Sequence, residues 1–197
     1  MLYLFARWVC RCFFTLVYRW KVDGAHHIPS NGPVIVCCNH IGNLDPPLVG
    51  SALQRKVHFM AKEELFRVPL LGRLIQALGA FPVKRGASDK RAIKQALTLL
   101  EQNRVLVIFP EGTRSKTGKL GDGRPGAAFL ALKSNATVVP AAIIGPYRLF
   151  RPIRVRFGAP VDLTPWLKAK VSTETTKEAT KRIMQEIRHL IEEGSKQ

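Results

Sequence analysis

A histidine and an aspartate stand five positions apart in the segment CCNHIGNLDPPL, residues 37–48. A carboxylate within hydrogen-bonding distance of an imidazole fixes the ring tautomer and leaves the other ring nitrogen free to take a proton from a hydroxyl. His40 and Asp45 flank a loop that contains Gly42, so the backbone there can fold back on itself. The segment therefore predicts a general base, although Asp45 before Pro46 also has the pattern of a helix N-cap.

No protein nucleophile accompanies this pair in the sequence. The chain has no G-x-S-x-G elbow, and its TGKLGDG stretch lacks the Ser or Thr that follows the lysine of a P-loop. The absence indicates that the substrate supplies the attacking hydroxyl. No group of residues has metal-ligand spacing, so we expect neither a metal nor a cofactor.

The elements that must position the pair follow from the pattern of apolar residues. Amphipathic stretches alternate with apolar runs along the chain, and the early connections are long enough for crossovers. The runs predict strands at 34–39, 57–62, 81–85, 105–110, 137–144 and 153–161, and the stretches predict helices at 46–53, 68–78, 89–102, 124–134 and about 173–193. This order predicts one α/β domain whose mixed sheet is largely parallel and flanked by helices. Pro140 makes the fifth strand the least secure.

Polar residues follow four of the predicted strands. His40 comes after the first strand, Lys62 ends the second and Arg85 ends the third. Glu111 and Arg114 follow the fourth strand, in FPEGTRS. Because the carboxyl ends of parallel strands share one edge of a sheet, these side chains should meet in one crevice. Converging cations bind phosphate, which predicts a substrate that carries both a phosphate and a hydroxyl.

Two of these segments resemble the signature boxes of the glycerolipid acyltransferases. NHIGNLD (39–45) is similar to the NHxxxxD box of that family, and FPEGTRS (109–115) is similar to its FPEGTR box. GAFPVKR (79–85) and VVPAAI (138–143) are similar to its intermediate and last blocks, which come in the same order. Within the family, the resemblance is greatest to the bacterial enzymes that acylate 1-acyl-sn-glycerol 3-phosphate, and it implies an α/β fold.

The resemblance implies an O-acyltransferase of phospholipid biosynthesis. His40 is then the general base, and Asp45 is its partner. The acyl group of acyl-CoA or acyl-carrier protein passes to the sn-2 hydroxyl of lysophosphatidate and gives phosphatidic acid. The implied substrate-binding residues are Lys62, Arg85, Glu111, Gly112, Thr113 and Arg114. The alternative is an enzyme whose acceptor is another lysophospholipid or glycerol 3-phosphate.

The charge of the chain limits its partners. Lys and Arg number 31 against 14 Asp and Glu, which gives a formal net charge of +17. Such a field attracts nucleic acid, anionic membranes and phosphorylated or CoA-like ligands. No nucleic-acid-binding module is visible, so we do not expect nucleic acid as a partner. A non-catalytic basic protein that binds membranes or nucleic acid is the remote alternative.

The first twenty residues, MLYLFARWVCRCFFTLVYRW, predict an amphipathic helix. Arginines interrupt the segment too often for a simple transmembrane span of about 20 apolar residues. Arg7, Arg11 and Arg19 form a stripe beside a wide aromatic face, which we expect to meet anionic headgroups. We therefore predict a membrane-associating helix at 1–21 and a catalytic domain at 22–197, on the cytoplasmic face of the cell membrane. A helix packed on its own domain is the alternative.

Overall fold

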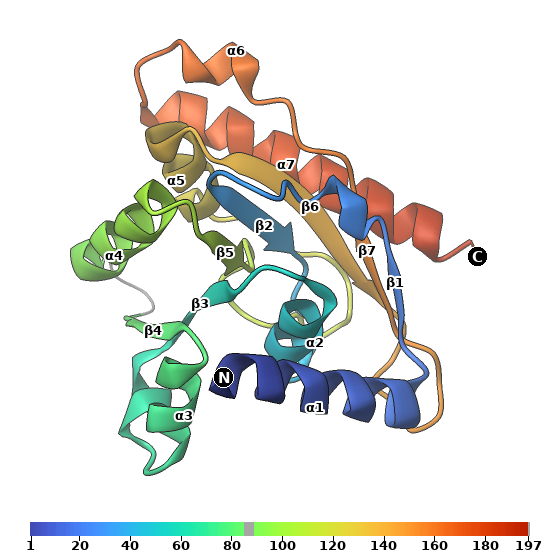
Figure 1. Ribbon diagram of the computed structural model, residues 1–197. Coiled ribbons are helices and arrows are strands. Elements are labelled where there is room, and N and C mark those ends of the chain that lie inside the picture. Colours follow the sequence, from blue (N-terminus) through green and yellow to red (C-terminus); the bar gives the residue numbers. More distant parts are fainter. Residues whose placement is uncertain (85–88, 197) are drawn as a thin grey trace.

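The computed structural model describes residues 1–84 and 89–196, within which seven strands form one sheet (Figure 1). The strands lie in the order β1-β7-β6-β2-β5-β3-β4, and among the described pairs only β6 and β7 run antiparallel. The strand bounds are β1 Lys21–Asp23, β2 Val34–Cys38, β3 Val57–Lys62, β4 Ala80–Val83, β5 Val105–Ile108, β6 Thr137–Ile144 and β7 Arg154–Phe157. The predicted α/β fold with a largely parallel sheet is confirmed.

Helices cover both faces of the sheet. Their bounds are α1 Leu2–Tyr18, η1 Ala25–His27, α2 Asp45–Ala52, η2 Glu63–Arg67, α3 Leu71–Ala77, α4 Lys90–Glu101, α5 Gly126–Ser134, α6 Thr164–Leu167 and α7 Thr173–Gly194, where η marks a 3-10 helix. Along β2, Val34, Val36 and Cys38 pack with α1 and α2, whereas Ile35 and Cys37 pack with α4, α5 and α7. Burial on both faces explains why this strand is an unbroken apolar run.

Pro140 lies inside β6, between β2 and β7, where a proline would ordinarily interrupt a ladder. Its carbonyl accepts a hydrogen bond of 2.9 Å from the Gly158 amide, which follows β7. Opposed residues of an antiparallel pair exchange both bonds, so the missing donor of Pro140 also faces this side. The last ladder pair there is Ala141 with Phe157, so the proline stands just beyond the end of the ladder.

The short elements escaped prediction. β1 has three residues and α6 has four, so neither is long enough to show a hydrophobic period. β1 extends the sheet by pairing in parallel with β7. The elements that the sequence does predict begin and end within a few residues of the expected positions, with η2 placed directly before α3.

α1 packs its basic side on the domain rather than turning it outward. The Arg7 guanidinium donates to the carbonyls of Leu53 and Gln54, and Arg11 Nε donates to the Ser51 carbonyl at 2.8 Å. These carbonyls belong to the end of α2, where helix carbonyls lack partners within the helix. The expectation that Arg7 and Arg11 meet headgroups is therefore wrong, because both side chains cap α2.

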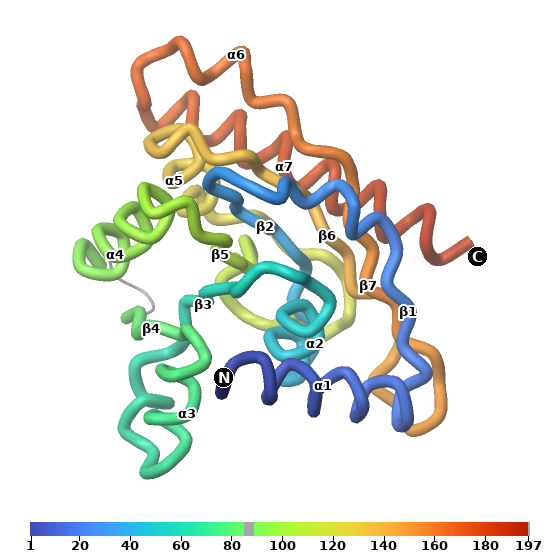
Figure 2. Tube along the Cα trace, viewed as in Figure 1, coloured from blue at the N-terminus to red at the C-terminus, as the bar shows by residue number. Residues whose placement is uncertain are grey.

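The outward side of α1 is apolar instead. Its seven most prominent apolar side chains within the helix are between 41% and 73% exposed, and they are Leu2, Leu4, Phe5, Trp8, Val9, Phe13 and Leu16. Figure 2 shows α1 running along the lower side of the molecule, from near β3 to the loop between β6 and β7. Among the described residues, no helix combines the length and hydrophobicity needed to cross a bilayer.

Candidate active site

The loop that carries His40 begins at Asn39, whose side chain is hydrogen-bonded to the backbone of β6. The Asn39 side chain, 3% exposed, accepts from the Ile143 amide at 2.7 Å and donates to the Ile143 carbonyl at 3.0 Å. These two hydrogen bonds connect the end of β2 to β6 and fix the position at which the chain leaves the sheet. This role of Asn39 was not predicted, because its partner lies 104 residues away.

His40 and Asp45 form the predicted pair. His40 Nδ1 lies 2.6 Å from Asp45 Oδ2, and Asp45 is fully buried. The same oxygen accepts the amides of Ile41 at 2.6 Å and Gly42 at 2.8 Å, so the carboxylate also folds the loop. α2 begins at Asp45 with Leu44 as its N-cap. The N-cap interpretation is therefore wrong, because the Asp45 side chain points back to the loop.

The imidazole is held by stacking as well as by Asp45. The His40 and Phe109 rings lie 4.2 Å apart between centroids, with 19° between their planes. Phe109 opens the FPEGTRS segment, so the second box supports the histidine of the first. With Nδ1 bound to Asp45 and the residue lining a cavity, Nε2 is the nitrogen available to accept a proton.

Hydrogen bonds to backbone groups also connect the loop that carries His40 with the loop that carries Glu111. The His40 amide donates to Glu111 Oε1 at 2.8 Å, and the Ser115 amide donates to the His40 carbonyl at 2.8 Å. Glu111 Oε2 accepts the Gly121 amide at 2.9 Å. Glu111 thus lies beside His40, as their positions after neighbouring strands predict, but both of its oxygens accept backbone amides.

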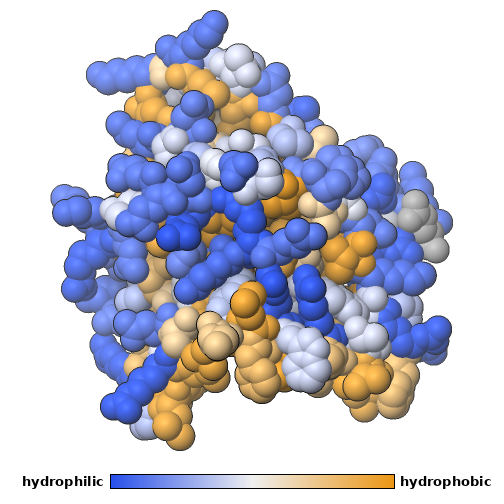
Figure 3. Space-filling view, viewed as in Figure 1, coloured by the Kyte–Doolittle hydropathy of each residue, from blue (hydrophilic) through white to orange (hydrophobic). Residues whose placement is uncertain are grey.

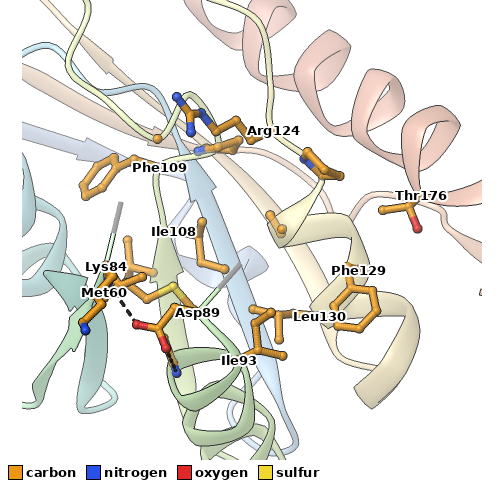
Figure 4. Close-up of a pocket in the computed structure, with 18 of the residues that line it drawn as sticks. Met60, Lys84, Asp89, Ile93, Ile108, Phe109, Arg124, Phe129, Leu130 and Thr176 are labelled. Carbon is orange, nitrogen blue, oxygen red and sulfur yellow. Dashed lines mark hydrogen bonds between the residues drawn. The ribbon is translucent and has the colours of Figure 1, made fainter. Parts of the chain in front are cut away.

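A cavity of about 780 Å³ opens next to His40. Figure 4 shows apolar side chains directed into it from β3, β5, α4 and α5, with Phe109 and Arg124 at one end. Besides Phe109, the labelled apolar residues are Met60, Ile93, Ile108, Phe129 and Leu130. The cavity continues to the first turn of α7, where Thr173 and Thr176 line it. Such a lining suits a long apolar group attached to a polar head.

The predicted cations are not all gathered at this cavity. Lys62 is half exposed and pairs with Glu64 at 3.2 Å, while Thr113 and Arg114 are exposed on the loop. In the described part of the chain, none of these three lines the cavity, whereas Gly112 does. Arg85 lies outside the described residues.

Two unpredicted cations line the cavity instead, Lys84 and Arg124. The Arg124 side chain lies across Gly112, where a Cβ atom would come within 2.8 Å of it. Gly112 also has a φ of 71°, a conformation that favours glycine. Arg124 directly follows the stretch TGKLGDG, which does not have the pattern of a P-loop and was not predicted to belong to the site.

Tyr147 is a further residue that sequence reasoning missed. Its hydroxyl donates to Asp45 Oδ1 at 2.6 Å, so it lies on the other side of the carboxylate from the bond to His40. Burial and the charge of Asp45 raise the pKa of Tyr147 far above its usual range. The residue belongs to no recognised box.

The described structure thus places a buried His–Asp pair beside an apolar cavity at one edge of an α/β sheet. The family model named Acyltransferase matches residues 19–144, a span that includes both loops, and this chain belongs to that family.

Curated relatives agree with this assignment. The chain is 34% identical over 127 residues to the 1-acyl-sn-glycerol-3-phosphate acyltransferase of Bacillus subtilis (strain 168), covering 64% of this chain and 63% of that protein. It is 33% identical over 131 residues to the chloroplastic 1-acyl-sn-glycerol-3-phosphate acyltransferase LPAT1 of Arabidopsis thaliana, covering 65% of this chain and 36% of that protein. The match thus spans less than two thirds of either relative.

A solved structure is similar over nearly the whole chain. It is the crystal structure of the 1-acyl-sn-glycerophosphate (LPA) acyltransferase PlsC from Thermotoga maritima, with a TM-score of 0.72 and 27% sequence identity. The similarity covers 96% of this chain and 78% of that one.

Proposed function

We propose that this chain is a 1-acyl-sn-glycerol-3-phosphate O-acyltransferase, which converts lysophosphatidate to phosphatidic acid with an acyl thioester as donor. The observation that carries the proposal is the buried His40–Asp45 pair, joined at 2.6 Å beside an apolar cavity, in a chain of the acyltransferase family. The relatives' names supply the acceptor. An enzyme for another lysophospholipid or for glycerol 3-phosphate is the alternative.

The proposed chemistry is direct acyl transfer. Nε2 of His40 takes the proton of the sn-2 hydroxyl as its oxygen attacks the thioester carbonyl. The tetrahedral intermediate then expels the thiolate of CoA or of the carrier protein, which receives the proton from the imidazolium. Asp45 keeps the Nδ1–H in place and stabilises the imidazolium in between.

Substrate binding divides between the cavity and its rim. The apolar lining supports binding of an acyl chain with its carbonyl near His40. We propose that Arg114 and Arg124 bind the acceptor phosphate, together with Lys62 and Arg85 as the family resemblance implies. Gly112 and Thr113 belong to the same loop, whose backbone Glu111 holds against His40.

We also propose that the lower side of the molecule rests on an anionic membrane. Figure 3 shows apolar side chains gathered along this side. Besides α1, they include exposed residues of η2 and α3 and of the β6–β7 loop, namely Leu65, Val68, Leu70, Leu71, Leu74, Leu149 and Phe150. Leu70 and Phe150 have positive φ values of 63° and 60°, so strained backbone presents two large apolar side chains to the exterior.

Exposed arginines stand close to each of these apolar groups in the chain. They are Arg19 at the end of α1, Arg67 and Arg73 around η2 and α3, and Arg148 and Arg151 in the β6–β7 loop. Apolar side chains flanked by cations fit a surface of anionic lipids. A peripheral position on the cytoplasmic face would give the site access to lysophosphatidate in the bilayer and to donors in solution.

An acceptor panel tests the proposed function. Purified protein is assayed with lysophosphatidate, lysophosphatidylcholine and glycerol 3-phosphate, each with acyl-CoA and with acyl-carrier protein. We expect the highest kcat/KM with lysophosphatidate, and sn-2 acylation of its glycerol. A higher kcat/KM with one of the other acceptors would replace the proposal by the corresponding alternative.

A further inference from the structure

The Asp45 carboxylate has a partner on each oxygen. Oδ2 accepts from His40 and from two loop amides, while Oδ1 accepts from the Tyr147 hydroxyl at 2.6 Å. Asp45 is fully buried, so the orientation of the carboxylate depends on these four protein donors. Three of them come from the loop that carries His40, and the fourth comes from a different part of the chain.

The Tyr147 ring is fixed from two sides. A Cβ atom on Gly42 would lie 2.7 Å from Tyr147 Cε2, so the ring packs directly on the glycine of the loop. The Tyr18 ring, at the end of α1, meets Tyr147 edge to face at 5.6 Å between centroids. Tyr18 is 8% exposed, so this contact belongs to the core between α1, α2 and the sheet.

The backbone joins the same two segments. The Phe150 amide donates to the Val17 carbonyl at 2.8 Å, and the Ile153 amide donates to the Tyr18 carbonyl at 3.1 Å. The segment that follows Tyr147 is therefore hydrogen-bonded to the last turn of α1. A continuous set of contacts runs from α1 through Tyr18 and Tyr147 to Asp45.

We propose that Tyr147 is a positioning residue for the His40–Asp45 pair, and that Tyr18 of α1 holds it in place. This inference rests on the proposed function, in which His40 is the base. Tyr147 packs with the α1–α2 core and is not among the described residues that line the cavity, so it acts through Asp45. Its hydroxyl orients the carboxylate toward Nδ1 of His40. By donating a hydrogen bond, it also weakens the effect of the carboxylate charge on the imidazolium.

Other ionisable groups surround the pair. Cys38 is buried near Asp45, and burial together with that charge raises the pKa of its thiol well above the usual range. Tyr147 likewise stays a phenol, so neither residue changes charge near neutral pH. Among the described residues, Cys38, Glu111 and Tyr147 interact with the pair, Tyr18 contacts Tyr147, and Lys84, Asp89 and Arg124 line the same cavity as His40.

Removing the Tyr147 hydroxyl should shift the pH dependence of the reaction in one definite direction. In Tyr147→Phe, Oδ1 loses its donor and the carboxylate charge acts more strongly on His40. The imidazolium is then stabilised relative to the wild-type protein. The acid limb of kcat/KM should move to higher pH, because the base must be unprotonated. We expect kcat to fall roughly tenfold, a fraction of the about 10²–10⁴ that a general base contributes.

The experiment compares two tyrosine variants. Tyr147→Phe should shift the pH profile and lower kcat, with little change in KM for lysophosphatidate. Tyr3→Phe is the matched control, because the Tyr3 hydroxyl also makes one hydrogen bond, from the Val57 amide at 3.1 Å near the other end of α1. Its pH profile should match the wild type. A Tyr147→Phe protein that is less stable but keeps the wild-type profile and kcat would overturn the proposal.

A measurement on the wild-type protein covers the case in which that variant does not fold. The chain has three tyrosines, so ¹³Cζ labelling gives three signals to assign. The Tyr147 signal should shift as His40 titrates, and the Tyr3 signal should not. A Tyr147 signal that ignores the His40 titration overturns the proposal. Activity retained in His40→Ala would instead contradict the role of His40 as the base, whereas a wild-type protein that does not acylate lysophosphatidate would contradict the proposed function itself.

Discussion

At the scale of the residue, Asp45 determines the geometry of the base through several bonds at once. It binds Nδ1 of His40, two amides of the loop and the hydroxyl of Tyr147. Together these bonds hold the buried carboxylate in one orientation. The imidazole therefore has a fixed tautomer before any substrate arrives.

His40→Ala should abolish most acyl transfer without unfolding the chain. The loop bonds of residue 40 use its backbone amide and carbonyl, which alanine keeps. We expect the rate to fall by about 10²–10⁴, the usual contribution of a general base. Initial rates with lysophosphatidate check the loss, and circular dichroism checks the fold. Near-normal rates in a folded variant would contradict the proposed mechanism.

Asp45→Asn should lower both activity and stability. An amide in place of the carboxylate turns an NH₂ group toward at least one of the four donors, wherever it points. A buried donor left unsatisfied costs about 1–3 kcal/mol, so the free energy of unfolding should fall by that amount. Urea unfolding followed beside the rate assay measures both effects. Unchanged stability would show that the loop tolerates a donor at this position.

The spacing of His40 and Asp45, with the family resemblance, was enough to predict the pair. The residues that support it were not predictable, because they are distant in the chain. Tyr147 lies 102 residues from Asp45, and the Ile143 backbone lies 104 residues from Asn39. No local pattern marks such partners, since only the order of strands in the sheet brings them together.

At the scale of the element, the two loops act as one unit. Glu111 joins the backbone of residue 40 to that of residue 121 with its two oxygens. His40 in turn stacks on Phe109 of the same loop. A change at this junction should therefore move the base even though Glu111 does not contact its ring nitrogens in the described structure.

Glu111→Gln tests the junction. The glutamine oxygen can satisfy one amide, but its NH₂ group then faces the other, which leaves a buried donor without an acceptor. We expect a loss of about 1–3 kcal/mol in stability, with a drop in kcat that exceeds the change in acceptor KM. Thermal or urea unfolding and steady-state kinetics provide the two readouts. Glu101→Gln, at an exposed site, is the matched control.

A predominant rise in acceptor KM for Glu111→Gln would instead place that side chain in the binding of lysophosphatidate.

Element positions were largely predictable from apolar runs, but the orientation of α1 was not. As a sequence pattern, the stripe of Arg7 and Arg11 is equally compatible with facing lipid and with facing protein. The stripe faces protein because Arg7 and Arg11 bind carbonyls at the end of α2 that have no partner within the helix. These carbonyls come into reach only in the folded chain.

At the scale of the whole molecule, exposed apolar groups gather on the lower side of a chain that is strongly positive overall. The formal net charge of +17 gives long-range attraction to anionic lipids, which salt screens. Each basic residue near such a surface contributes about 1 kcal/mol. The apolar side chains of α1 contribute a part that salt does not screen. Raising salt should therefore weaken sedimentation with anionic vesicles without abolishing it.

The triple variant Phe5→Ser, Trp8→Ser and Leu16→Ser tests the membrane face directly. These side chains are 63%, 62% and 73% exposed, so their loss should change stability little. The protein should leave vesicles even at low salt, and activity on bilayer-embedded lysophosphatidate should fall more than activity on a short-chain soluble acceptor. Leu167→Ser, an exposed leucine on α6, is the control. If the triple variant still sediments with vesicles but unfolds more easily, α1 is a core helix of the domain and lipid binding resides elsewhere.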